Sequence, residues 1–253
     1  MEYGVRVFVR GRYGFQTSRE GTTATVTPRA GLLLGDMATD PPTMITLTED
    51  GAPQRYRVLV HNYCGNLGRS LVMRETLTTD RMTAQSGGLY IGSALDAAAN
   101  TYPDRLSPDI VAKVLNIALP CQTSTSDLTA VGTYQRRAFV LSFREFGATD
   151  STVPDFLPKK LILMGDPIPY FATIANRIML NSRGSAAWHY TRDAVKMAGV
   201  TGGTFYYGAV HSTGSFTTSN GPVDVYPAIC FTLPSNMIFN MTPNADGSYS
   251  PIL

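Results

Sequence analysis

Alternating apolar and polar positions at the start of the chain predict strands. In residues 3–9 a tyrosine and three valines occupy every second position, as in a strand with one buried face. Residues 22–27 form a second run, rich in the β-forming residues threonine and valine. Asp40-Pro41-Pro42 then interrupts regular structure. We expect an N-terminal β appendage for docking or assembly over residues 1–43, followed by the main domain over residues 44–253.

The pattern sharpens at the start of the main domain. Two apolar runs, residues 44–47 and 56–60, predict two strands. Between them lies Glu49-Asp50-Gly51, whose glycine suits a turn with positive φ. A third strand is expected at residues 71–74, after a glycine-containing turn at residues 65–69.

Two helices are expected next. Ser93, followed three residues later by Asp96, is a pattern that starts a helix. Ser107-Pro108 starts a second helix with proline at the first helical position. Helical spacing of apolar residues then predicts that this helix continues through residue 118 and ends before Pro120. The apolar residues are Ile110, Val111, Val114, Leu115 and Ala118.

The remaining chain is predicted as short strands separated by long loops rich in glycine, threonine and serine. Strand candidates are residues 137–143, 205–210 and 223–233, and residues 176–180 lead to the segment that contains the only tryptophan. Residues 160–164 are either a strand or a short apolar packing segment. Internal repeats and heptads are absent from the sequence. The order of elements indicates an α+β fold.

Composition limits the partners. Apolar residues make up 43% of the chain and charged residues 16%, below the roughly 25% that is usual for soluble domains. Uncharged polar surfaces of this kind are expected where proteins pack in an assembly. The net charge is only +2, and most cations are arginines, which form fixed hydrogen bonds rather than solvated charges. Basic runs with interleaved aromatics are lacking, so nucleic acid is not expected as a partner.

Cysteine and histidine spacing predicts neither a disulfide framework nor a metal site. Cys64, Cys121 and Cys230 are odd in number and lack CxxC spacing. Free thiols made in a reducing cytoplasm are the expected state. The first residues show no signal-peptide pattern, and apolar runs fall short of the roughly 20 residues of a membrane span. We therefore expect no ordinary secretion and no membrane insertion.

The only tryptophan, Trp188, opens the segment Trp188-His189-Tyr190-Thr191-Arg192-Asp193. In an extended segment its side chains alternate between two faces. The segment can be a ligand wall of aromatic and charged groups. Alternatively, Trp188 fills the core and Arg192 ties loops together. The second reading is favoured, because a lone tryptophan usually serves packing.

Familiar catalytic motifs are not recognisable. The chain has no G-x-S-x-G nucleophile elbow for Ser-His-Asp chemistry. Glu145, Asp150 and Asp155 lie in loops that do not fix a glycosidase pair, and the acidic residues lack calcium-loop spacing. Gly65–Arg69 has neither the G-K-[ST] sequence nor the strand-to-helix context of a phosphate loop. We expect no catalytic residues, no metal and no cofactor.

Six segments, read in order, resemble the uncharacterised DUF6273 domain. They are residues 49–59, 68–74, 90–96, 137–142, 165–192 and 225–230. The fifth contains Tyr170-Phe171, Arg177-Ile178 and Trp188 in the order of the family's YF, RI and WWLRS elements. Two positions depart from the family pattern: the second tryptophan is His189, and the arginine of the closing strand is Tyr226.

The resemblance implies a C-type-lectin-like, formylglycine-generating-enzyme-like fold with two helices, short antiparallel strands and long loops. It also implies a tail-associated bacteriophage virion protein without assigned catalysis, assembled in the host cytoplasm. Adhesion to the host surface or assembly is then the expected role. The alternatives are a capsid or neck decoration protein and, third, a formylglycine-generating-like or glycan-modifying enzyme. Expected partners are other virion proteins, a host cell-surface glycan or protein, and further copies of the chain.

Two groups of residues are predicted to carry these roles. Contacts with a ligand or partner are expected at Trp188, His189, Tyr190, Arg192, Tyr206, Tyr207 and His211. Core positions are expected at Trp188, Arg69, Arg74, Phe139, Phe171 and Pro227. Among these, Trp188 is expected as the central pin of the fold.

Overall fold

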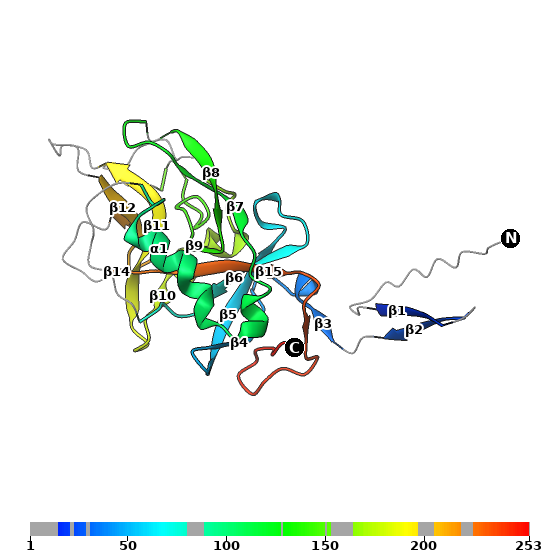
Figure 1. Cartoon of the computed structure of the whole chain (residues 1–253). Coiled ribbons are helices and arrows are strands. Elements are labelled where there is room, and N and C mark those ends of the chain that lie inside the picture. Colours follow the sequence, from blue (N-terminus) through cyan, green and yellow to red (C-terminus); the bar gives the residue numbers. More distant parts are fainter. Residues whose placement is uncertain are drawn as a thin grey trace.

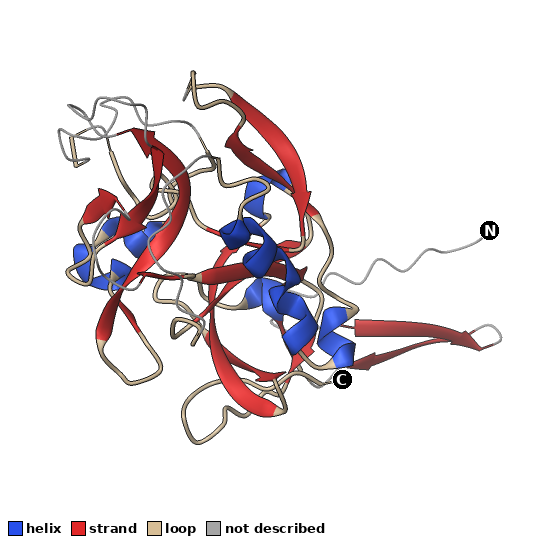
Figure 2. Cartoon of the chain, turned by 60° about the vertical axis from the view of Figure 1, so that its left-hand side comes forward, coloured by secondary structure: helices blue, strands red, loops and turns tan. Residues whose placement is uncertain are grey.

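The computed structural model describes residues 15–20, 23–28, 31–79, 89–127, 129–149, 151–152, 164–196, 205–218 and 225–252. These residues form an α+β fold with mostly antiparallel strands and three short α-helices, built around two five-stranded sheets (Figure 1, Figure 2). The predicted α+β class is therefore confirmed. None of the described helices is long and apolar enough to cross a membrane.

The first sheet contains the strands that the sequence predicted best. Its order is β4-β5-β6-β15-β9, and all pairs are antiparallel. The strands are β4 (Met44–Glu49), β5 (Ala52–His61), β6 (Arg69–Arg74), β15 (Ile229–Pro234) and β9 (Ala138–Val140). Asp50 and Gly51 close the β4–β5 hairpin with φ angles of 49° and 78°, the positive values that such a two-residue turn requires. The strands predicted at residues 44–47, 56–60 and 71–74 are confirmed.

Other parts of the chain close the outer edge of β4. The Thr46 amide donates to the Tyr249 carbonyl at 2.9 Å, and the Tyr249 amide donates to the Met44 carbonyl at 3.0 Å. Further along the strand, the Ser107 amide donates to the Thr48 carbonyl at 3.0 Å. An open strand edge invites pairing with other chains. These bonds occupy the groups that an added strand would need.

The second sheet is built on one long strand, β11 (Ala186–Lys196). Its order is β10-β11-β12-β13, and β14 also pairs with β11, in parallel. The other strands are β10 (Met179–Leu180), β12 (Phe205–Val210), β13 (Phe216–Thr218) and β14 (Val225–Tyr226). The β11–β12 register is irregular between Tyr190 and Ala194. Consecutive residues of β11 are buried there, so both of its faces are covered.

Smaller elements complete the fold. Three two-stranded pairs are β1 (Phe15–Glu20) with β2 (Thr23–Pro28), β3 (Leu32–Leu33) with β16 (Ile238–Phe239), and β7 (Ile117–Gln122) with β8 (Val131–Arg136). The α-helices are α1 (Ala94–Thr101), α2 (Pro108–Val111) and α3 (Ile174–Arg177). Short 3₁₀ turns are η1 (Leu34–Asp36), η2 (Tyr63–Gly65), η3 (Tyr102–Arg105) and η4 (Pro169–Ala172).

The first predicted helix is confirmed together with its cap. The Ser93 hydroxyl accepts a hydrogen bond from the Asp96 amide at 3.1 Å. The Asp96 carboxylate in turn accepts from the Gly92 amide at 2.8 Å. The first bond satisfies an amide that the first helical turn leaves free, and the second ties the residue before the N-cap to the helix.

The second helix was predicted too long. It ends at Val111, and residues 117–122 form β7 instead of a last helical turn. Ile117, Leu119 and Cys121 are buried at every second position, which is the period of a strand. Leu115, expected on the buried helix face, is 56% exposed.

Other expectations are met in part. The run predicted at residues 223–233 is two strands, β14 and β15, separated by Pro227 and Ala228. The strand predicted at residues 137–143 is limited to β9. The predicted strand at residues 3–9 lies outside the described residues. So does the segment at residues 160–164, predicted as a strand or an apolar packing segment, except for Met164.

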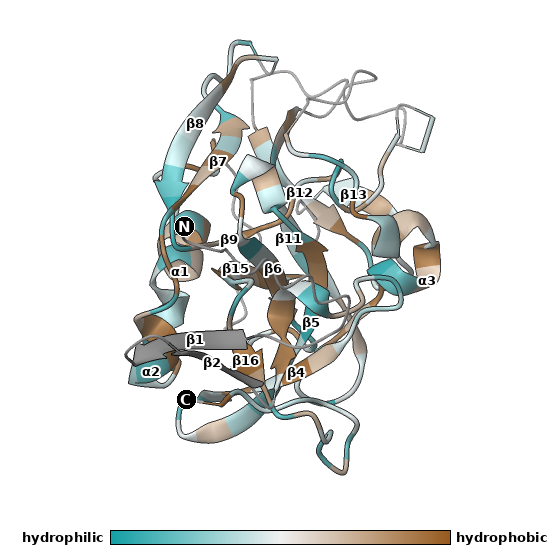
Figure 3. Ribbon diagram, turned by 90° about the vertical axis from the view of Figure 1, so that its right-hand side faces the viewer, coloured by the Kyte–Doolittle hydropathy of each residue, from teal (hydrophilic) through white to brown (hydrophobic). Residues whose placement is uncertain are grey.

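One hydrophobic core joins the two sheets and includes residues near the N-terminus. Figure 3 shows the hydrophobic strands β5 and β6 at the centre of the molecule. Leu34 and Met37 are buried in the same core, whereas the β1–β2 hairpin lies outside it in Figure 1. The domain boundary at residue 43 stays a prediction.

Candidate functional site

The residues predicted to contact a ligand lie on β11, on β12 and in the turn after β12. Four of them are buried: His189, Tyr190, Arg192 and Tyr207. The other three, Trp188, Tyr206 and His211, are partly exposed. The predicted set therefore divides into a buried group and a surface group.

Arg192 is the centre of the buried group. Its guanidinium forms a two-pronged ion pair with Glu145, in which Nη2 lies 2.9 Å from Oε1 and Nη1 donates to Oε2. The remaining donors reach the carbonyls of Pro120 (3.1 Å), Val140 (3.1 Å) and Met164 (3.2 Å). Both charged side chains are fully buried. Burial opposes the charge on Arg192, but Glu145 outweighs it and raises the pKa of the guanidinium well above its ordinary value.

Glu145 is enclosed by further donors. The Tyr63 hydroxyl donates to its Oε1 at 2.5 Å, and the Ser142 amide donates to its Oε2 at 2.8 Å. Gly165 covers the carboxylate so closely that a Cβ there would lie 2.2 Å from Oε1. We call Arg192, Glu145 and Tyr63 the inner cluster. Its charges are satisfied within the protein, so the cluster serves to join segments rather than to bind a ligand.

A second buried ion pair lies at one end of the first sheet. The Glu49 carboxylate accepts from Arg74 Nε at 2.9 Å and from the hydroxyls of Tyr56 (2.7 Å) and Tyr102. Arg105 approaches within 3.7 Å and is itself 30% exposed. We call Glu49, Arg74, Tyr56 and Tyr102 the outer cluster. Burial opposes ionisation of Glu49, but these hydrogen bonds outweigh it and hold its pKa below the ordinary value.

The surface group is brought together at one end of β11 and β12. The register that pairs His189 with Val210 continues to Trp188 and His211. Their ring centroids lie 4.5 Å apart with planes inclined at 54°. This pair could not be recognised from the sequence, because 23 residues separate its members and only the strand register brings them together.

Tyr206 lies on a different face. Trp188 and Tyr190 share one face of β11, and Tyr190 meets Tyr207 edge-on with ring centroids 5.9 Å apart. Tyr206 precedes Tyr207 and therefore points to the opposite face of β12. The structure thus brings together two of the three surface residues.

The turn after β12 extends the surface around Trp188. The His211 amide donates to the Ser215 carbonyl at 2.8 Å, and His211 Nδ1 accepts from the Thr213 amide at 3.0 Å. The backbone of Gly214 packs against Ile174, which is 58% exposed; a Cβ at Gly214 would lie 2.4 Å from the Ile174 carbonyl. We call Trp188, His211, Ile174 and turn residues 212–215 the Trp188 patch.

His189 and Asp193, in the same strand as Arg192, are both buried. Burial lowers the pKa of His189 to about 3, so its imidazole is neutral at physiological pH. The ring packs against Phe146 at 5.1 Å. Burial raises the pKa of Asp193 to about 6, although the Phe143 amide donates to its carboxylate at 2.7 Å. Neither group offers acid–base chemistry to a ligand at the surface.

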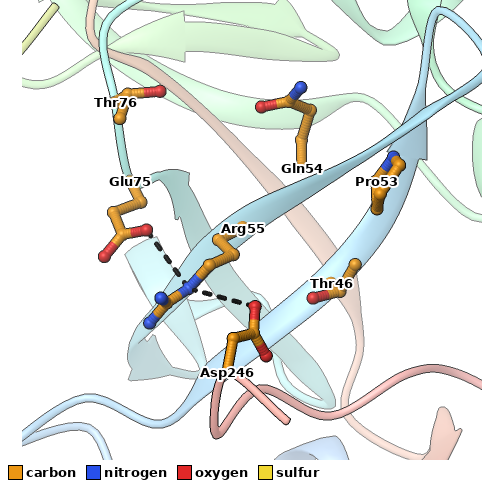
Figure 4. Close-up of a pocket in the computed structure, with 7 residues that line it drawn as sticks. All are labelled: Thr46, Pro53, Gln54, Arg55, Glu75, Thr76 and Asp246. Atoms are coloured by element: carbon orange, nitrogen blue, oxygen red, sulfur yellow. Dashed lines mark ion pairs between the residues drawn. The ribbon is translucent and has the colours of Figure 1, made fainter. Parts of the chain in front are cut away.

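A polar pocket of about 230 Å³ lies on another side of the first sheet (Figure 4). Its lining residues are Thr46, Pro53, Gln54, Arg55, Glu75, Thr76 and Asp246. Arg55 Nε lies 3.2 Å from the Glu75 carboxylate and 3.8 Å from the Asp246 carboxylate. The guanidinium thus compensates the carboxylates, and the lining offers no aromatic face. The Trp188 patch is therefore the stronger candidate site.

The residues predicted for the core are placed as follows. Phe139, Phe171, Pro227 and Arg74 are buried. Arg69 is partly buried, and its guanidinium joins strands and loops by donating to the carbonyls of Thr232 (2.7 Å) and Lys113 (2.9 Å). Trp188 is partly buried and packs against the core from its periphery. The largest fully buried side chain among the described residues is that of Arg192.

Three contributors cannot be identified from the sequence. Glu145 is recognisable only as a member of a possible carboxylate pair, and no sequence pattern marks Tyr63 or Ile174. Glu145 and Arg192 are 47 residues apart, and neither has a local motif that names the other. An exposed isoleucine at a helix start, such as Ile174, also gives no signal of its own.

Two further chemical features concern metal ions and thiols. Among the described residues, no group of three or more histidine, cysteine, aspartate or glutamate side chains could hold a metal ion. The cysteines are free thiols, and burial raises the pKa of Cys64 to about 11 and of Cys121 to about 12. Comparison with known proteins finds no matching family model, curated protein or solved structure, so the resemblance to DUF6273 stays a prediction.

Proposed function

We propose that this chain is a tail-associated bacteriophage virion protein whose lectin-like domain adheres to a host-surface glycan. The observation that carries the proposal is the Trp188–His211 pair, a partly exposed aromatic contact at the end of a sheet. Aromatic side chains supply a large contact area at low conformational cost and are frequent at binding hot spots. The family resemblance supplies the virion setting.

The chemistry of the patch suits a sugar ring. The indole of Trp188 offers a face for the apolar side of a pyranose, and Ile174 adds apolar surface. Ser212 and Thr213 supply hydroxyls in the same turn. The inner cluster holds β11 in place behind the patch, so little ordering is needed on binding.

Binding to host cells and to a glycan array tests the proposal. Trp188→Ala should weaken binding about tenfold or more, equivalent to ~1.4 kcal/mol, as loss of a hot-spot aromatic does. Tyr206→Ala is the matched control, because it removes a partly exposed aromatic from the opposite face of β12. Both variants should stay folded at the assay temperature, with similar decreases in the thermal midpoint, because both side chains pack against the core. Equal binding by Trp188→Ala and the wild type would refute the role of the patch.

The alternative role is assembly, and the β1–β2 hairpin favours it. This two-stranded unit lies outside the body in Figure 1, and an isolated hairpin is only marginally stable without further packing. Deletion of residues 1–30 spares Leu34 and Met37 and should leave the body folded. An assembly role requires that this truncated chain fails to enter virions; unchanged incorporation would contradict it.

A further inference from the structure

β8 is the outer strand of the β7–β8 hairpin. Figure 3 shows it at the margin of the molecule, with β7 between it and β11. Every second residue of β8 is exposed, beginning with Val131 at 40%. Within the described residues β8 pairs only with β7, so its second edge has no backbone partner there.

The strand register identifies the backbone groups that face outward. The Thr123 amide donates to the Ala130 carbonyl at 2.9 Å, directly next to the β7–β8 register. Backbone groups in an antiparallel strand face the partner and the opposite side in alternation. The amides and carbonyls of Val131, Thr133 and Gln135 therefore point away from β7.

Pro120 in β7 agrees with this alternation. Pro120 lies opposite Thr133. At such a position the backbone N–H does not donate to the partner strand, so a proline, which has no N–H, is tolerated. Its carbonyl is turned away from β8 and accepts from Arg192 Nε at 3.1 Å. Pro120 and Thr133 therefore form a non-hydrogen-bonded pair within the β7–β8 hairpin.

The outward edge lacks the features that usually block pairing. Exposed edges are normally protected by charges, proline or a bulge, whereas residues 131–135 are uncharged and contain no proline. The adjacent Arg136 pairs with the Asp96 carboxylate, with its Nε 2.6 Å away, and its Nη1 donates to the Gln135 carbonyl at 2.8 Å. A carbonyl oxygen has two lone pairs, so that of Gln135 keeps one for an added strand. By contrast, the edge of β4 is covered by other parts of the chain.

We propose that β8 pairs with β8 of a second copy of this chain, antiparallel about a two-fold axis at Thr133. Thr133 then faces its own copy, and Val131 faces Gln135, so no like charges oppose each other. Each of these residue pairs exchanges both backbone hydrogen bonds. Cross-strand threonine pairs are favourable. The sequence of this edge is thus complementary to itself, which identifies a second copy rather than another peptide as the occupant.

The size of the contact sets the expected affinity. One strand pair buries less than the 1,200–2,000 Å² of a standard interface. We expect a dissociation constant on the order of micromolar, as for transient complexes. This inference does not depend on the proposed glycan binding, because the Trp188 patch and β8 lie on different elements.

Sedimentation of the full chain over a range of concentrations tests the pairing. The wild type should form dimers, and Thr133→Pro should weaken dimerisation at least tenfold, because it removes an outward amide without breaking the hairpin. Thr133→Val keeps that amide and should dimerise like the wild type. Near-UV circular dichroism checks that both variants are folded. A monomeric wild type at every concentration, or a folded Thr133→Pro chain that dimerises normally, would overturn the proposal.

Cysteine crosslinking tests the register independently. Thr133→Cys should form an intermolecular disulfide, since Cα atoms across a hydrogen-bonded pair lie about 5.5 Å apart. Gln135→Cys alone should not, because its copy would lie about 13 Å away. A mixture of Val131→Cys and Gln135→Cys should crosslink. The wild type controls for native cysteines. Crosslinking of Gln135→Cys with itself, or a different partner protein captured by β8, would overturn the two-fold pairing.

Discussion

The inner and outer clusters contain the same types of side chain but differ in their exposure to solvent and in the segments that they join. Each contains a buried glutamate held by an arginine and by tyrosine hydroxyls. In the outer cluster the arginine is 25 residues from the glutamate, and another arginine, Arg105, connects the site to solvent. In the inner cluster the separation is 47 residues, and both charged groups are fully buried.

The difference concerns what each cluster joins. Arg74 donates mainly within its own neighbourhood, to Thr76, Leu77 and Gln54 besides Glu49. Arg192, on the second sheet, donates to carbonyls in β7 and β9 and in the segment that begins at Met164. A buried ion pair contributes little net stability, but removing one partner leaves an uncompensated charge. The inner cluster should therefore be the more sensitive to substitution.

Arg192→Met should cause the largest effect. It leaves Glu145 without its cation in a site closed to water, and the free energy of unfolding should fall by about 3–5 kcal/mol. Urea denaturation measures this loss. The double variant Arg192→Met/Glu145→Leu removes both charges and should be more stable than the single variant. A loss no larger than that of Arg74→Met would contradict the distinction between the clusters.

The carboxylates beside the two arginines should give opposite pH dependence. The pKa of Asp193 is raised from 3.8 to about 6, so the folded state holds a proton that the unfolded state releases. Its contribution is fully present below about pH 4 and is lost as the pH rises through 6, a change of about 3 kcal/mol. The lowered pKa of Glu49 acts the other way: its contribution is present above its ordinary pKa of 4.5 and is lost as the pH falls further.

Asp193→Asn isolates the first of these effects. The amide oxygen can still accept from the Phe143 amide, but the side chain no longer titrates. Urea unfolding between pH 4 and pH 7 should therefore lose the part of its pH dependence that Asp193 causes. An identical pH profile in Asp193→Asn and the wild type would show that Asp193 has an ordinary pKa in the folded state.

Arg74→Met should have a smaller effect than Arg192→Met. Glu49 keeps two tyrosine hydroxyls and the approach of Arg105, and water reaches the rim of the site. Loss of hydrogen bonds to a charged group suggests a decrease of about 2 kcal/mol in the free energy of unfolding. Raising the salt concentration should change this value more than that of Arg192→Met, because exposed charges are screened. Equal salt dependence would count against the openness of the outer cluster.

Local signals explain what the sequence could predict. The β4–β5 hairpin has its turn residues, Asp50 and Gly51, directly between two apolar runs. The cap of α1 likewise needs only Ser93 and Asp96. The second helix was extended too far because helical spacing of apolar residues competed with the alternation that follows it in β7.

The roles of Trp188, Arg192 and His211 could not be predicted from the sequence, because their partners are distant along the chain. Trp188 stands out in the sequence because of its size, yet the largest fully buried side chain of that segment is Arg192, whose partner Glu145 lies in a distant loop. Likewise, His211 joins Trp188 only through the pairing of β11 with β12. The composition of residues 188–193 was enough to single out this segment. Which of its side chains is buried and which is exposed depends on contacts with distant parts of the chain.

Two tyrosine variants, each of which removes a single hydroxyl group, compare the stability contributions of the two clusters. Tyr63→Phe removes the only side-chain hydroxyl that donates to Glu145 among the described residues, whereas Tyr102→Phe leaves Tyr56 bound to Glu49. We expect losses of about 2 kcal/mol for Tyr63→Phe and about 1 kcal/mol for Tyr102→Phe, measured by urea unfolding. Tyr134→Phe, in β8, controls for loss of a phenol outside both clusters. If Tyr102→Phe proves the more damaging, the outer cluster depends on each hydroxyl more than the inner one does, and the ranking of the two clusters is reversed.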